Sequence, residues 1–237
     1  MDNGLETLSL SAPFSRTLSD QVAGQLRQAI LMGRLKPGQR IVEHEIAQAM
    51  AISRGPVRDA LRILQNERLV VQYPHRGAFV AWLTLRDAEE IYSIRRELEM
   101  LAVEFAVKYA TDEQIEELTQ VIEQMRARMQ QGYTQPEATD LDLDFHETLC
   151  RISGHGRALA AWTALRGQVR LLILTHGVLQ PTDLRENAAE WHCMLVDAVR
   201  EREVEAAREI LRQHLAASYA TVRKAIEEGK LEQAIDE

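Results

Sequence analysis

The chain has 237 residues, of which 46% are apolar and 27% charged, values typical of one large or two ordinary globular domains. Its longest aliphatic run, Leu171 to Leu174, is too short to cross a bilayer, and its two cysteines exclude a disulfide scaffold. Residues 1–81 hold 10 basic and 7 acidic side chains, a net +3, whereas residues 82–237 hold 18 and 29, a net −11. This asymmetry favours a small nucleic-acid-binding head on an acidic body. Aromatic residues make up only 5%, which disfavours a protein that stacks single-stranded bases.

Residues 1–16 have no hydrophobic period, and we interpret them as a flexible arm. The arm carries Asp2 and Glu6 instead of the basic start and apolar block of a secretory signal, so we expect a cytoplasmic protein. From Leu18 to Met32 apolar residues recur on one helical face, and Gly33 is a typical helix stop. Turn residues at 36–39 and a short helix over about 43–50 follow.

The stretch from Ser53 to Glu67 is the most informative helix of the N-terminal part. Its apolar residues and its arginines lie on separate faces of the helix. The apolar face consists of Val57, Ala60, Leu61 and Leu64, and the basic face consists of Arg54, Arg58 and Arg62. Ser53 is a good N-cap, and Pro56 lies in the first turn, where a missing N–H is tolerated. This pattern predicts the recognition helix of a helix-turn-helix, although a solvated basic stripe would look the same.

Two β-prone runs, 69–71 and 78–80, follow this helix and are separated by a turn with His75, Arg76 and Gly77 at its tip. Three helices and a basic hairpin predict a winged helix-turn-helix over residues 17–81. Residues 36–81 resemble the DNA-binding domain of the GntR family of bacterial transcription regulators, through the SRGPVRDAL core and the RGAFV wing.

The resemblance implies contacts to bases or phosphates from Arg54 and Arg58, with help from His44 and from the wing residues His75, Arg76 and Gly77. Gly55 stands where the family usually has threonine, which implies an altered base preference. Residues 66–68 also differ from the usual pattern, which implies a shifted wing.

The pattern changes after a short linker at 82–86, and we expect a helical effector-binding and dimerisation domain over 87–230. Helices are predicted over about 86–110, 111–131, 136–152, 157–176, 182–200 and 203–228, with a capping box at 111–114. In the first of them, Ile91, Ile94 and Leu98 are expected on the buried face. No strand pattern follows Val80, so the fold class is mainly α, with a bundle of about six helices.

Four residues of the predicted bundle have the chemistry of metal ligands. Asp142 and His146 are four residues apart and project from one helix face, and His192 and His214 lie near apolar positions of the last two helices. One carboxylate and three imidazoles suit Zn²⁺, Ni²⁺ or Mn²⁺. Each histidine taken alone is equally well explained as a hydrogen-bonded core residue. Residues 86–226 resemble the FCD-type effector domain, and this resemblance implies that the four residues bind a divalent metal.

Arg95 is a second unusual residue, because it falls on or beside an apolar helix face, where an unpaired guanidinium is costly. It either pairs with an acid such as Glu99 or binds the carboxylate of a ligand in a bidentate manner.

These patterns and resemblances predict a metabolite-responsive transcription regulator, a repressor, that is not an enzyme. We expect a homodimer on a palindromic double-stranded DNA operator, a small organic acid as effector, and no membrane partner. The alternative is a metal-dependent enzyme that uses the Asp/His/His/His site, although no separate general base or nucleophile is evident. A third interpretation is a structural adaptor with a degenerate head.

Overall fold

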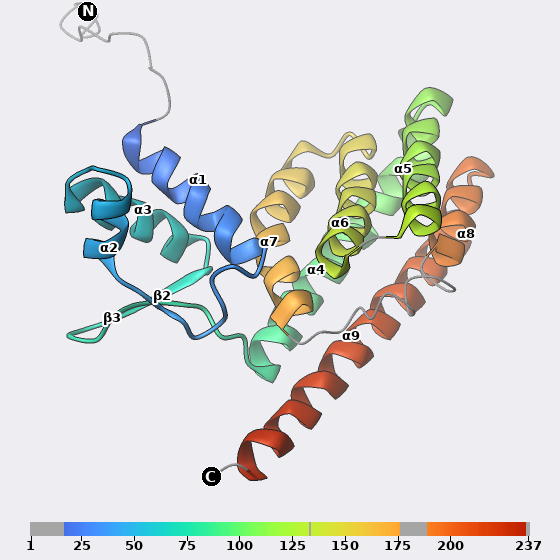
Figure 1. Cartoon of the computed structure of the whole chain (residues 1–237). Helices are drawn as coiled ribbons and strands as arrows, with labels where there is room; N and C mark the ends of the chain where they lie inside the picture. The colour runs from blue at the N-terminus through green and yellow to red at the C-terminus, as the bar shows by residue number, and fades with distance from the viewer. Residues whose placement is uncertain (1–16, 133, 176–188, 236–237) are drawn as a thin grey trace, which may run out of the picture.

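A computed structural model describes residues 17–132, 134–175 and 189–235, in which a small N-terminal head is joined to a larger helical domain (Figure 1). The arm predicted over 1–16 and the first residues of the helix predicted over 182–200 lie outside these ranges. Among the described residues, no helix combines the length and the apolar character that crossing a membrane requires.

The head contains three helices and three short strands. In chain order these are α1 (Leu18–Leu31), β1 (Arg40–Ile41), α2 (Glu43–Ala49), α3 (Arg54–Asn66), β2 (Val70–Tyr73) and β3 (Gly77–Val80). Thr17 closes a capping box on α1, in which its hydroxyl accepts a hydrogen bond from the backbone of Asp20. Ala51 adopts a φ of 53°, a left-handed conformation that turns the chain between α2 and α3.

The apolar face predicted for α3 is completely buried, and α3 packs on α1. This face consists of Val57, Ala60, Leu61 and Leu64. The predicted hairpin is confirmed, with β2 and β3 antiparallel and Gly77 at a φ of 96°. The strand β1 was not predicted. It pairs antiparallel with β3, placing Arg40 opposite Phe79, and gives a three-stranded sheet in the order β1-β3-β2.

Six helices make up the described part of the second domain, which contains no strand. They are α4 (Leu85–Tyr109), α5 (Asp112–Gln131), α6 (Gln135–Ile152), α7 (Gly156–Thr175), α8 (Ala189–Arg200) and α9 (Val204–Ile235). Capping boxes at Thr84 and Thr111 begin α4 and α5, as the sequence predicts for the second. The prediction that Ile94 lies on the buried face of α4 is wrong: this side chain is 53% exposed. It lies a third of a turn from Arg95, and the bundle covers α4 on the side of Arg95.

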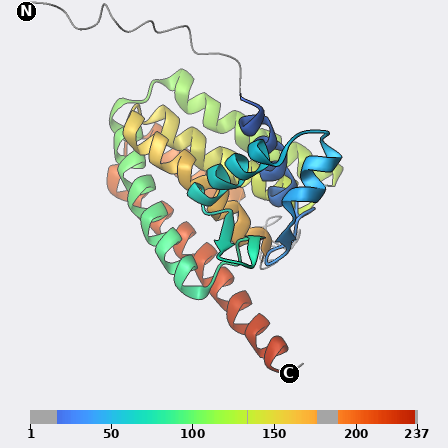
Figure 2. The same cartoon turned by 90° about the vertical axis from the view of Figure 1, so that its left-hand side faces the viewer.

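The long helices α4 and α9 pack side by side, with α6 and α7 against α4 and α8 against both, and the C-terminal part of α9 projects beyond the other helices (Figures 1 and 2). Two clusters of buried apolar residues hold the protein together. One is shared by the head and the adjoining end of the helical domain, and includes Leu61, Leu69, Ile91 and Leu165. The other fills the far end of the bundle around Phe145. Because each fully buried side chain of this size contributes about 1.5–3 kcal/mol, the shared cluster holds the head against the bundle.

The α7 helix contacts both the head and α6. A β-carbon added at Gly167 would lie 3.7 Å from Cδ2 of Leu69, at the junction of α3 and β2. On the side of α6, Arg170 binds Asp140 through two hydrogen bonds of 2.5 and 2.8 Å, and Arg166 pairs with two further acids of α6, Asp144 and Glu147. The α7 helix is therefore the element through which α6 contacts the head.

Candidate metal centre and nucleic-acid interface

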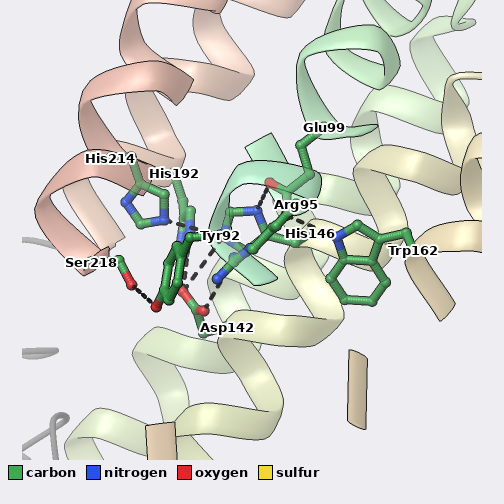
Figure 3. A network of polar contacts seen from close by, with 9 residues as sticks. All are labelled: Tyr92, Arg95, Glu99, Asp142, His146, Trp162, His192, His214 and Ser218. Atoms are coloured by element: carbon green, nitrogen blue, oxygen red, sulfur yellow. Dashed lines mark hydrogen bonds and ion pairs between the residues drawn. The ribbon is translucent and has the colours of Figure 1, made fainter. Parts of the chain in front are cut away.

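The four predicted metal ligands meet in the interior of the bundle. Asp142 and His146 come from α6, His192 from α8 and His214 from α9, and their ligand atoms all lie within 4.8 Å of one another (Figure 3). The Nε2 atom of His146 lies 3.1 Å from Nε2 of His214 and 3.7 Å from Oδ1 of Asp142. Three ligands are buried and His214 is half-buried. Three helices therefore bring one carboxylate and three imidazoles together.

Glu99 of α4 is not one of the four residues of this cluster, but it orients one of them, His146, through a hydrogen bond. Its Oε2 atom accepts a hydrogen bond of 2.6 Å from Nδ1 of His146, and its Oε1 atom accepts bonds from Arg95 Nε at 2.7 Å and from Trp162 Nε1 at 2.8 Å. A carboxylate can only accept here, so Nδ1 of His146 carries a proton, and in the neutral ring the lone pair lies on Nε2, which faces the other ligands. The sequence pattern predicts Glu99 only as a partner of Arg95, and it gives no signal for Trp162.

The two buried acids are held in their charged forms. Burial by itself would raise the pKa of Glu99, but the adjacent Arg95 and His146 outweigh it and hold the pKa well below the ordinary value. Burial likewise opposes the charge of Asp142, and His146 is the largest of the neighbours that keep its pKa low. The site thus contains two ionised carboxylates, of which Asp142 belongs to the ligand cluster and Glu99 is already engaged by His146, Arg95 and Trp162.

Two of the histidines are held neutral. Burial, reinforced by His214, lowers the pKa of His192 well below its ordinary value, and burial with His146 lowers the pKa of His214 to about 4. Both ring nitrogens of His192 are buried and lack a hydrogen-bond partner among the described residues, since Oδ1 of Asp142 lies 3.5 Å away. A buried nitrogen without a partner costs about 1–3 kcal/mol, which a cation bound to the lone pair would offset. The donor set therefore fits a divalent metal ion.

Arg95 lies beside this cluster and is buried, with 1% of its surface exposed. Its Nε atom pairs with Glu99, as one of the two sequence interpretations expects, and its Nη2 atom is 3.9 Å from Oδ2 of Asp142. Neither Nη1 nor Nη2 has a hydrogen-bond partner among the residues that the structure describes. Its guanidinium lies 5.8 Å from the ring centre of Tyr92, whose hydroxyl is 2.9 Å from the hydroxyl of Ser218. Two donor groups of Arg95 thus remain unused.

The residues predicted to contact DNA all lie on the exposed surface of the head. Arg54, Gly55 and Arg58 occupy the first turns of α3, and His44 lies at the start of α2. Arg58 donates a hydrogen bond of 2.8 Å to Glu43, but its side chain remains 60% exposed.

The other predicted contacts lie in the wing. His75, Arg76 and Gly77 form the tip of the β2–β3 hairpin, where Arg76 lies 5.7 Å from the ring centre of Tyr73. The start of a recognition helix and a basic hairpin tip are the parts of a winged head that reach a major groove and the adjacent backbone.

Comparison with known proteins agrees with both halves of this description. Residues 18–80 match the family described as "Bacterial regulatory proteins, gntR family", and residues 90–217 match the FCD domain. The chain is 31% identical to the HTH-type transcriptional regulator YdhC of Bacillus subtilis, over 89% of this chain and 93% of that protein. It is also 31% identical to a probable D-xylose utilization operon transcriptional repressor of Paenarthrobacter nicotinovorans, over 88% and 92% of the two chains.

A solved structure of a putative GntR transcriptional regulator from Rhodococcus sp. RHA1 superimposes with a TM-score of 0.73 at 27% identity, covering 86% of this chain and 96% of that one. The family and these relatives are transcriptional regulators and not enzymes, so the alternative of a metal-dependent enzyme is not supported. The chain therefore belongs to the GntR family of bacterial transcriptional regulators, with a winged helix-turn-helix head and an FCD domain.

Proposed function

We propose that this regulator is a metabolite-responsive repressor whose helical domain holds one divalent cation and a small organic acid. The observation that carries the proposal is the buried cluster of four ligand groups directly beside Arg95, whose two terminal nitrogens lack partners. A relative described as a repressor of a sugar-utilization operon supports the direction of control. We further infer a cytoplasmic homodimer, because a palindromic operator requires two heads related by a two-fold axis.

Asp142, His146, His192 and His214 would hold the cation, which their chemistry restricts to the class of Zn²⁺, Ni²⁺ and Mn²⁺. When bound, such an ion supplies Lewis acidity and open coordination positions to the oxygen atoms of a carboxylate. Glu99 contributes by holding the proton on Nδ1 of His146, which keeps Nε2 available. Burial of the cluster excludes water and strengthens every charge interaction within it.

Arg95 would bind the carboxylate of the effector. Its pairing with Glu99 uses Nε, so Nη1 and Nη2 can donate two parallel hydrogen bonds to one carboxylate. The fork is held rigidly, because Glu99 is itself fixed by Trp162 and His146. This rigidity lowers the entropy cost of binding the acid.

The response to the acid would be a population shift. An acid that contacts both Arg95 and the metal ligands favours one packing of α4, α6, α8 and α9 over others. Because α7 holds α6 through Arg166 and Arg170 and also contacts the head, a change in that packing alters the position of the head. DNA contact itself would fall to Arg54, Arg58 and their neighbours on α2, α3 and the wing.

The test combines metal content, thermal stability and ligand binding. Purified protein is incubated with Zn²⁺, Ni²⁺ or Mn²⁺, desalted and analysed for bound metal, and then titrated with a panel of small organic acids by calorimetry. We expect about one ion per chain and a melting temperature that falls on addition of a chelator. His192→Ala should remove that fall, whereas His155→Ala should keep it, because His155 caps α7 and is not one of the four ligands. Protein that retains no metal and melts identically with chelator refutes the proposal.

A further inference from the structure

A groove with a volume of about 510 Å³ lies between the head and the helical domain, where α1 runs beside α7 (Figure 1). It exists because part of α7 carries small side chains on the face toward the head. Ala160, Ala164 and Gly167 follow one another at intervals of four and three residues, so they share this face and leave space in front of it. Leu31 of α1 and the buried Leu69 form the apolar wall on the side of the head. A groove of this volume can hold a small molecule.

The lining of this groove carries an excess of positive charge. It contains three arginines against one acid, a net charge of +2, with Arg27 and Glu67 from the head and Arg166 and Arg170 from α7. Arg27 and Glu67 pair with each other, and Nε of Arg27 lies 2.7 Å from Oε2 of Glu67. The acids that pair with Arg166 and Arg170 belong to α6 and do not line the groove. The excess charge therefore comes from the two guanidinium groups of α7.

Arg170 has a hydrogen-bond donor that none of the described residues uses. The residue is only 5% exposed, and its Nε and Nη2 atoms bind the carboxylate of Asp140. Its Nη1 atom is buried and has no hydrogen-bond partner in the part of the chain that the structure describes. This nitrogen has lost its contact with water without gaining another partner, which is costly for a charged group. An anionic oxygen that reaches it from the groove forms a charge-assisted hydrogen bond and removes that cost.

We propose that this groove binds a short aliphatic carboxylate, with the carboxylate at Nη1 of Arg170 and the carbon chain against Leu31, Leu69 and the small residues of α7. The apolar walls favour a carbon chain, and a single unused donor favours a monoanion over a phosphate, which needs several donors. The site is separate from the one proposed at Arg95, which lies in the interior of the bundle and has two unused donors. With one donor instead of two, the groove is the weaker of the two sites.

An acid in this groove contacts both domains at once. Its carboxylate binds α7 and its carbon chain covers Leu31 and Leu69 of the head, so it bridges the two elements that meet at Gly167. A ligand whose site is complete only while the head lies against α7 stabilises that position of the head. The groove therefore gives a metabolite a second way to act on the head, and this way needs neither the metal ligands nor Arg95.

NMR of the full-length protein, labelled with ¹³C at its alanine methyl groups, tests this site because Ala160 and Ala164 report from its wall. The probe is hexanoate, and hexanamide is its uncharged match. Ala164→Leu fills the groove, and Ala160 still reports on binding in this variant. Ala161→Leu is the control, since Ala161 is exposed on the same helix and does not line the groove. Arg95→Ala separates the groove from the site proposed in the bundle, and circular dichroism melts verify that every variant is folded.

We expect hexanoate to shift both alanine signals in a saturable manner, and hexanamide to bind at least about tenfold more weakly, because the amide lacks the charge that Arg170 recognises. Ala164→Leu should raise the Kd of hexanoate at least about tenfold by a steric clash, whereas Ala161→Leu and Arg95→Ala should change it by less than about twofold. The proposal is overturned if neither signal shifts, if hexanamide binds equally well, or if folded Ala164→Leu protein binds normally. Loss of the shifts in Arg95→Ala assigns the acid to the bundle and also overturns it. No arm of the experiment uses a metal or an operator, so its result is independent of the proposed function.

Discussion

Glu99 accepts three hydrogen bonds in the interior of the protein, so its replacement by glutamine should have two separable effects. The change is isosteric and creates no cavity. The amide oxygen can accept from both Arg95 and Trp162 only if the amide nitrogen faces Nδ1 of His146. Nδ1 must then become the acceptor, which moves the ring proton to Nε2 and removes the lone pair that faces the other ligands.

The size of the stability loss follows from the burial of the Arg95–Glu99 ion pair and from the charge of Asp142, which stays near Arg95 in the variant. Breaking a buried ion pair by removing one partner costs about 3–5 kcal/mol in the free energy of unfolding. Arg95 keeps Asp142 at 3.9 Å, so we expect a loss near the lower limit, about 3 kcal/mol, for the metal-free protein. Loss of the correct tautomer should weaken metal binding by at least about 10–100-fold, the effect typical of removing a group that orients a metal ligand.

Chemical denaturation of the metal-free protein measures the first effect, and competition with a chelator of known affinity measures the second. Glu97→Gln is the matched control, because the Glu97 side chain is 71% exposed and pairs with the adjacent Arg96 at the surface. The control should change stability by less than about 0.5 kcal/mol. If Glu99→Gln unfolds as easily as wild type and binds metal equally well, the argument from the buried network is wrong.

Three further outcomes are expected. Arg58→Ala should weaken operator binding at fixed salt by about 1–3 kcal/mol. Arg62→Ala should weaken it less, because Arg62 lies one turn further from the start of the helix. Equal operator affinities of the two variants in a gel-shift titration would contradict this order. Arg95→Ala should abolish calorimetric binding of a carboxylate effector while leaving operator affinity intact, and unchanged heats would remove Arg95 from the effector site. Thr84→Ala should reduce the free energy of unfolding by about 1 kcal/mol, because the Thr84 hydroxyl caps α4 by accepting a hydrogen bond from the backbone of Asp87. A change below about 0.3 kcal/mol in denaturant titrations would contradict this role of the cap.

Most helices could be predicted because their signals are local. The capping box at Thr111 and the apolar period of α3 are read directly from neighbouring residues, and both are confirmed. The strand β1 escaped prediction because two residues have no period, and its existence depends on pairing with β3, almost 40 positions away. Ile94 was misassigned because an apolar residue near an apolar face looks buried until the position of neighbouring helices is known.

The candidate site likewise contains some residues that local sequence patterns predict and others that they do not. The spacing of Asp142 and His146 predicts that they share a helix face, but only the FCD resemblance related them to His192 and His214. Glu99 lies 47 positions from His146 and 63 from Trp162, and no local pattern connects these residues. Such a network depends on how α4, α6 and α7 pack, which the sequence patterns do not specify.

The contact at Gly167 has a genetic consequence. An alanine there would make an ordinary van der Waals contact with Leu69, but any longer side chain must displace Leu69 and push the recognition helix away from α7. Each domain would still fold, yet the head would no longer follow changes inside the bundle. Under the proposed function, a screen for alleles that uncouple operator binding from the effector should therefore recover bulky substitutions at position 167, far from the residues proposed to contact DNA and metal. Alanine at this position should be phenotypically silent.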